Sequence, residues 1–134
     1  MAVTVTNNVI AALNTNQAIT VNAATSTVVG GTEVFTLTPT KSGGKLALLF
    51  VEASTAATGK CSFSIAAGDL WAGKAVTGTF GSTAAAGSLD ALEVDTARVL
   101  QDDGTISITV SPGDTSASML ANTHHMKMYA LSLL

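Results

Sequence analysis

Short runs of alternating apolar and polar residues recur along this chain, and they constrain its fold more than any other feature. Alternation with a period of two is typical of a β-strand that buries one face. Thr, Val and Ile, the β-branched residues that favour strands, make up 37 of the 134 residues. The alternating runs lie at residues 3–6, 18–22, 34–38, 61–65, 75–80, 105–110 and 127–133. The chain is therefore expected to be nearly all β.

Turn-forming residues, rather than helices, separate these runs. Ser42-Gly43-Gly44 is one such cluster, and Ser111-Pro112-Gly113-Asp114 is another. No amphipathic helix of useful length is apparent. Many short strands joined by turns are typical of an antiparallel β-sandwich, and we expect a jelly-roll or immunoglobulin-like arrangement. Residues 18–134 should form this single domain, and residues 1–17 should be an N-terminal arm or a first short strand.

For several strands the sequence allows more specific predictions. Pro39 cannot donate to a central ladder, so the strand over residues 34–38 should end there or lie at a sheet edge. The nearly continuous apolar run at residues 46–52 predicts a strand that is buried on both faces. Cys61 is the only cysteine and lies in an alternating run, so we expect it to be a small core residue. In the last strand two faces are predicted, one with Met128, Ala130 and Ser132, the other with Tyr129, Leu131 and Leu133.

A β-hairpin is predicted near residue 103. Residues 92–100 lead into Asp102-Asp103-Gly104, and the strictly alternating run 105–110 follows. Asp-Gly between two such runs is a hairpin signal, because the tight primed turn requires positive φ. The register stays open: a two-residue loop would face Val99 toward Ile108, and a three-residue loop would face Leu100 toward Ile106.

Charged residues are scarce in this chain. They make up 11% of it, against about 25% in typical soluble domains, while 47% of the residues are apolar. Six Lys and Arg against nine Asp and Glu give a net charge of −3, the wrong sign for a protein that binds nucleic-acid phosphates. A surface with few charges suggests that other copies or a partner cover part of it. The alternative is a monomer that its Thr and Ser side chains keep soluble.

No recognisable catalytic or cofactor motif is present in the sequence. There is no Gly-x-Ser-x-Gly elbow, and Gly43-Gly44-Lys45 lacks the other residues of a phosphate-binding loop. His124-His125 suggests a metal, but adjacent residues on a strand point to opposite faces and no third ligand is apparent. We therefore expect a protein that is not an enzyme and that binds neither a cofactor nor a metal.

The sequence also predicts no membrane partner. The longest apolar run, residues 46–51, is six residues long, whereas a membrane-spanning helix needs about 20. No secretory signal is visible at the N-terminus.

Trp71, Arg98 and a group of asparagines are candidate contact residues. Trp71 lies in the glycine-flanked loop 68–73, where it would anchor an interface or cover the end of the core. Arg98 is the only Arg, and five carboxylates flank it in the sequence, so it would pair with one of them within the chain or across a subunit contact. An extended arm over residues 6–17 would cross to a neighbouring subunit, which makes its asparagines interface candidates: Asn7, Asn8, Asn14 and Asn16.

Two stretches, taken together, resemble small structural proteins of tailed bacteriophages. They are residues 65–74, Ile-Ala-Ala-Gly-Asp-Leu-Trp-Ala-Gly-Lys, and residues 92–108. The pattern Leu-Glu-x-x-x-Ala-Arg-hydrophobic-x-Gln-x-Asp-Gly-x-Ile in the second stretch carries the likeness, which covers 27 residues, about a fifth of the chain. Such β-rich proteins include head decoration, or cement, proteins.

The resemblance implies a non-enzymatic virion protein that binds the outer surface of the head shell and stabilises it. Its partner would then be the major capsid protein, and it would act as a homo-oligomer, with a trimer favoured, on a capsid assembled in the host cytoplasm. The alternatives are another virion subunit from a tail tube, tail fibre or connector, a carbohydrate-binding or adhesin-like β-sandwich, and a small enzyme on a β scaffold.

Overall fold

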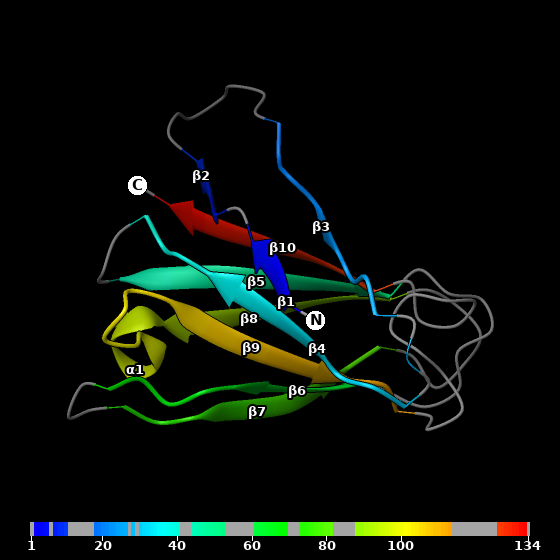
Figure 1. Ribbon diagram of the computed structural model, residues 1–134. Helices are drawn as coiled ribbons and strands as arrows, with labels where there is room; N and C mark the ends of the chain where they lie inside the picture. The colour runs from blue at the N-terminus through cyan, green and yellow to red at the C-terminus, as the bar shows by residue number, and fades with distance from the viewer. Residues whose placement is uncertain are drawn as a thin grey trace.

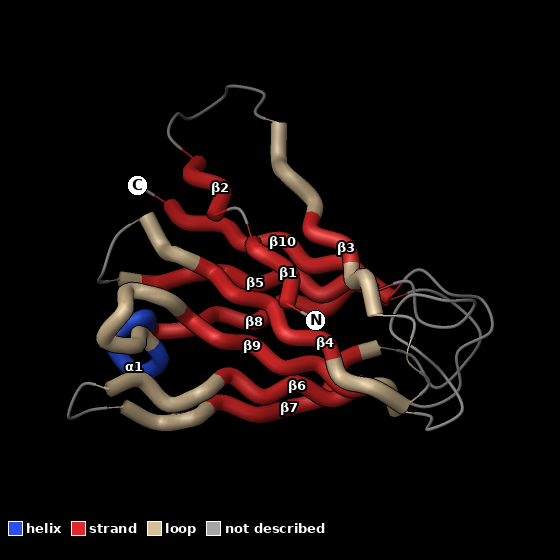
Figure 2. Tube along the Cα trace, in the orientation of Figure 1, coloured by secondary structure: helices blue, strands red, loops and turns tan. Residues whose placement is uncertain are grey.

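Two β-sheets packed face to face make up the computed structural model of this chain, with a one-turn helix at one end (Figure 1, Figure 2). The structure describes residues 2–5, 7–10, 18–26, 28, 30–40, 44–52, 61–69, 73–81, 88–113 and 126–133. Within these residues the elements are β1 (Ala2–Val5), β2 (Asn7–Ile10), β3 (Asn22–Ala23), β4 (Glu33–Leu37), β5 (Lys45–Glu52), β6 (Cys61–Ile65), β7 (Val76–Phe80), β8 (Ser88–Asp95), α1 (Thr96–Val99), β9 (Ile106–Ser111) and β10 (Met126–Leu133).

The strands divide into two sheets. Sheet A has the order β1-β4-β9-β6-β7, and sheet B has the order β2-β10-β5-β8, with β3 also paired to β10. Neighbouring strands are antiparallel except β1 beside β4 and β2 beside β10, which are parallel. The prediction of an all-β antiparallel sandwich is confirmed, with these two parallel pairs as its exceptions.

The N-terminal segment contributes an edge strand to each sheet. β1 pairs with β4 in sheet A, and β2, one residue later, pairs with β10 in sheet B. Asn7 fastens this crossing, because its Nδ2 donates to Thr40 Oγ1 (2.9 Å) and its Oδ1 accepts from Ser132 Oγ (3.1 Å). Residues 2–5 and 7–10 thus lie as strands on their own domain. A further contact of residues 1–17 with a neighbouring subunit stays a prediction.

Alternation along the strands places one face of each sheet in a shared core. In β6, Cys61, Phe63 and Ile65 are buried while the two serines between them are exposed, which confirms Cys61 as a core residue. In β10, Met128 and Ala130 are buried, whereas Tyr129 and Leu131 on the other side are half-buried, so the predicted division of this strand into two faces is confirmed.

Three phenylalanines fill the middle of this core. The ring centroid of Phe50 lies 5.1 Å from that of Phe63 and 4.8 Å from that of Phe80. Gly78 makes room for this packing, because a Cβ on it would lie 2.7 Å from Cζ of Phe63. The glycine therefore accommodates a ring and does not interrupt β7.

One carboxylate is buried among these apolar side chains. Glu33 at the start of β4 is fully buried, and its oxygens accept hydrogen bonds from the backbone N–H groups of Thr25 (3.1 Å) and Ser26 (2.5 Å). The Thr25 hydroxyl donates a third bond (3.1 Å). These donors satisfy the buried carboxylate and fasten the segment after β3 to sheet A.

The predicted hairpin near residue 103 is wrong. β8 belongs to sheet B and β9 to sheet A, so neither of the two open registers forms. The cause is α1, because Asp95 caps it by accepting from the backbone N–H of Ala97 (3.0 Å) and the helical turn carries the chain from one sheet to the other. The Asp-Gly signal still marks a turn, in which Gly104 has φ 80° and its N–H donates to the Gln101 carbonyl (2.9 Å).

The strand predicted at residues 18–22 is also wrong in extent. Only Asn22 and Ala23 pair with β10. The apolar side chains Ile19 and Val21 are 41% and 44% exposed, whereas Asn22 is buried and its Nδ2 donates to the Met128 carbonyl (3.0 Å). Asn22 faces the protein because its amide has a buried backbone partner, whereas Thr20 is exposed.

The strand predicted at residues 46–52 is present as β5, but it is fully buried on one face only. Leu46, Leu48 and Phe50 point into the core. Ala47, Leu49 and Val51 point outward and are half-buried. β4 ends at Leu37, two residues before Pro39, as predicted.

Candidate interaction surface

The outer face of sheet A carries hydroxyl side chains. β-strand alternation turns Ser and Thr outward on five neighbouring strands, opposite the buried core residues. Val34 also lies on this face. We call it the hydroxyl face, and its residues are Thr4, Thr36, Ser107, Thr109, Ser111, Ser62, Ser64, Thr77 and Thr79.

The outer face of sheet B is apolar instead. Its three longest strands, β10, β5 and β8, turn aliphatic side chains and one tyrosine outward. Leu89 is 67% exposed, and the other side chains range from half-buried to exposed. We call it the apolar face, and its residues are Ala47, Leu49, Val51, Leu89, Ala91, Tyr129 and Leu131.

Strand register sets the layout of the apolar face. Leu49 on the central strand β5 is paired with Tyr129 on one side and Ala91 on the other. Ala47, two residues earlier, lies between Leu131 and Glu93. The face therefore consists of rows that cross three strands, with Leu49 at its centre.

Charged side chains stand at opposite corners of the apolar face. Lys127 on β10 is exposed beside Val51 at one end, and Glu93 and Asp95 on β8 are exposed toward the other end. Lys45 lies next to this acidic pair, and its Nζ is 2.8 Å from Oε1 of Glu93. The hydrogen bond and then the charge of Glu93 raise the pKa of Lys45. Both side chains are largely exposed, so this pair shapes the charge pattern more than it stabilises the fold.

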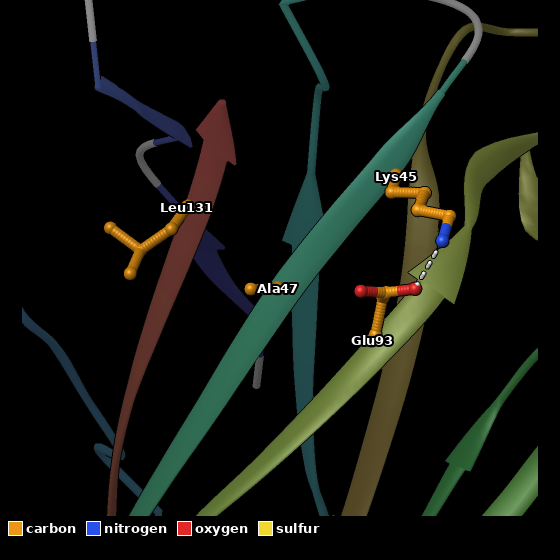
Figure 3. Close-up of a pocket in the computed structure, with 4 residues that line it drawn as sticks. All are labelled: Lys45, Ala47, Glu93 and Leu131. Atoms are coloured by element: carbon orange, nitrogen blue, oxygen red, sulfur yellow. Dashed lines mark ion pairs between the residues drawn. The ribbon is translucent and has the colours of Figure 1, made fainter. Parts of the chain in front are cut away.

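A hollow lies beside this ion pair. It measures about 230 Å³ and is lined by Lys45, Ala47, Glu93 and Leu131 (Figure 3). The short side chain of Ala47 leaves this space, because its row neighbours are much larger. A volume below the ~300–1,000 Å³ of small-molecule pockets fits a single side chain better than a substrate.

Arg98 lies in α1 and forms no ion pair with any of the five carboxylates that flank it in the sequence, all of which the structure describes. Its side chain is exposed, and it forms no ion pair with another described residue. Its backbone carbonyl accepts from the N–H groups of Gly68 and Lys74, both at 2.9 Å, and so holds the two ends of the loop predicted at residues 68–73. Asp69 adds a link, because its Oδ2 accepts from the N–H of Asp102 (2.8 Å).

Of the other predicted contact residues, the structure describes only Asn7 and Asn8. Trp71, Asn14 and Asn16 lie outside the described residues, as do His124 and His125. Asn8 belongs to β2 and pairs in register with Leu131. The side chain of Asn7 bonds within its own chain, as described above. The interface roles of all six candidate residues stay predictions.

The described residues offer no obvious chemical centre. They contain no group of three or more His, Cys, Asp or Glu side chains that could hold a metal ion. In the same part of the chain, no helix has the length and apolar character that a membrane span requires.

Sequence reasoning did not identify the apolar face. The signal was present in the run at residues 46–51, where both the inward and the outward positions are apolar. Its partners on β8 and β10 could not be chosen without knowing which strands are neighbours.

Comparisons with known proteins bear on the fold. No family model matches the chain, and no curated protein matches it. Among solved structures, a similar one is CBM35 from Cellvibrio japonicus Abf62, with a TM-score of 0.50 and 13% sequence identity over 84% of this chain and 74% of that chain. At this identity the likeness concerns the fold alone, and it agrees with a jelly-roll type of β-sandwich.

Proposed function

We propose that this chain is a non-catalytic structural subunit of a virion, and specifically a head decoration protein that binds the outer surface of the capsid shell. The major capsid protein is its proposed partner. The site of its function is then a protein contact and not a pocket for a small molecule.

The difference between its two outer faces carries this proposal. A sandwich that worked alone in water would be expected to solvate both faces, as the hydroxyl face does with Ser and Thr. The apolar face instead leaves Leu89, Leu49 and Tyr129 at least partly uncovered. An apolar surface of this kind, rimmed by charges, is typical of a protein contact site.

The resemblance to phage structural proteins supports the finer part of the proposal. Its two stretches meet in space, because the Arg98 carbonyl binds Gly68 and Lys74, and Asp69 binds Asp102. The shared pattern thus belongs to one packed end of the molecule. The scarcity of charge, 11% of residues, suits a subunit with extensive protein contacts.

Co-sedimentation with undecorated capsid shells tests the proposal. The protein should pellet with the shells at a saturating, symmetry-related copy number and should raise the temperature at which the shells break. Leu49→Lys should weaken this binding, whereas Thr109→Lys on the hydroxyl face serves as the matched control. Absence of binding by the folded wild-type chain would contradict the proposal.

Carbohydrate binding is the second candidate function, and the likeness to a CBM35 module favours it. Against it, three of the four phenylalanines stack in the core and Phe35 is also fully buried, so they offer no exposed platform for a sugar ring. Tyr129 is the remaining aromatic side chain among the described residues, and it is half-buried on the apolar face. Affinity electrophoresis in gels that contain plant or bacterial polysaccharides tests this candidate: retardation that Tyr129→Ala abolishes would favour it over the virion role.

A further inference from the structure

We propose that the apolar face pairs with the same face of a second copy of this chain around a two-fold axis at Leu49. This inference deepens the proposed function, and it rests on that function only in assigning the apolar face to a protein contact. It names a second copy, and not the shell itself, as the occupant of the face. Leu49→Lys would then weaken shell binding because single copies lose the avidity of a pair.

The charges on the face are self-complementary. Lys127 lies one row to one side of Leu49 on β10, and Glu93 lies one row to the other side on β8. Standard strand dimensions place these two residues about 13 Å apart along the strands and about 10 Å apart across them, with Leu49 midway. In a two-fold contact, residue i meets residue j and residue j meets residue i. The axis that passes through Leu49 in the plane of the contact, perpendicular to the line from Lys127 to Glu93, therefore sets Lys127 of each copy against Glu93 of the other.

The same rotation matches the shapes of the two faces. It brings Tyr129 of one copy over Ala47 of the other, where the hollow of about 230 Å³ lies. The ring would fill the space that the short alanine leaves, and its hydroxyl would approach the Lys45–Glu93 ion pair (Figure 3). Leu49 would meet Leu49 on the axis. The positions of the charges, of the hollow and of Leu49 therefore all fit the same two-fold arrangement.

The size of the face predicts how strong the contact is. Three rows on three strands cover roughly 20 Å by 14 Å, or about 280 Å² on each copy. Two such faces bury less than the ~1,200–2,000 Å² of stable interfaces, so the dimer should dissociate readily in dilute solution. It would form fully where copies are held close together, as on the surface of a common shell. A trimer would need a different contact, because a two-fold contact joins copies only in pairs.

Sedimentation equilibrium of the purified chain, from about 10 μM to about 1 mM, tests the inference at concentrations suited to a small interface. The wild type should shift from 13.4 kDa toward twice that mass as concentration rises. Leu49→Lys should stay monomeric, while Thr109→Lys should behave as the wild type does. A wild type that stays monomeric throughout, or an oligomer that Leu49→Lys leaves intact, would overturn the inference.

Charge reversal tests the two-fold arrangement itself. Lys127→Glu and Glu93→Lys should each weaken self-association by about tenfold or more, because each leaves like charges opposed. Mixed in equal amounts, the two variants should associate again, since each supplies the charge that the other lacks. Failure of the mixture to associate would reject this register, even if a dimer exists.

The outcomes separate this inference from the proposed function. If the wild-type chain binds shells but stays monomeric at all concentrations, the decoration role is supported and the two-fold dimer is rejected. A dimer with the expected charge dependence that ignores shells would do the reverse.

Discussion

The two outer faces of this sandwich are built by the same alternation of residues, yet they suit different surroundings. On sheet A the outward positions are Ser and Thr, whose hydroxyls bond to water without adding charge. On sheet B the outward positions of β5, β8 and β10 are mostly aliphatic. Since the two sheets share one apolar core, the needs of folding do not account for the difference. Under the proposed function, the outer face of sheet A faces solvent and that of sheet B faces protein.

The sharpest comparison lies within β5, whose two faces differ in burial. Phe50→Ala should lower the free energy of unfolding by about 3–5 kcal/mol, because Phe50 is fully buried between two other rings. Leu49→Ala should cost only about 1 kcal/mol, because Leu49 is half-buried on the outer face. Urea unfolding of both variants measures this. Equal losses would show that the apolar face already serves as core, and would remove the argument for a partner.

A buried carboxylate anchors sheet A, whereas the buried anchor of β3 in sheet B is the neutral amide of Asn22. Glu33→Ala should lower the free energy of unfolding by about 3 kcal/mol, because the buried N–H of Ser26 and its neighbouring donors lose their acceptor. Glu33→Gln keeps one carbonyl oxygen and should cost clearly less. Chemical unfolding compares the two variants. A loss from Gln as large as that from Ala would mean that the negative charge, and not the hydrogen bonding, stabilises this site.

Exchanging residues between the two faces should exchange their behaviour. Thr109→Leu places an aliphatic side chain between Val34 and Ser64 on the hydroxyl face and should promote self-association there. Leu49→Thr should reduce association through the apolar face. Static light scattering at matched concentrations measures both. If neither change moves the apparent mass, outward residue type does not govern association in this protein.

The smallest expected effect concerns the ion pair beside the hollow. Glu93→Gln should bring the pKa of Lys45 back toward its ordinary value, because Glu93 provides the main causes of its rise. A raised pKa in the folded state means that the pair stabilises the fold below the unfolded pKa and ceases to do so as the pH rises through the folded one. The wild type should therefore lose a slight advantage over the variant only at alkaline pH. NMR titration of the Lys45 side chain, with Lys127 as the internal control, follows this.

Local pattern predicted the strands well and their neighbours poorly. Alternation located β4, β6, β9 and β10, because burial of one face imposes a period of two within a single strand. The hairpin after β8 was mispredicted because α1 is only four residues long, too short to leave a helical period, although Asp95 is a good capping residue. The apolar face depends on Leu49, Ala91 and Tyr129, which are adjacent only after distant strands pair. No local pattern contains that information.

The order in which the sheets can be completed follows from the crossing of the N-terminal segment. β2 pairs with β10, so residues 7–10 find their hydrogen-bonding partners only at residues 130–133. A ribosome makes β2 long before β10 exists, and sheet B cannot be completed during most of synthesis. Pairings so distant along the chain carry a high entropic cost of loop closure and slow the final step of folding. Until β10 is made, the edge of β5 to which it pairs stays open, and the core beside that edge is uncovered. In this period chaperones or early assembly partners would have the most access to β5.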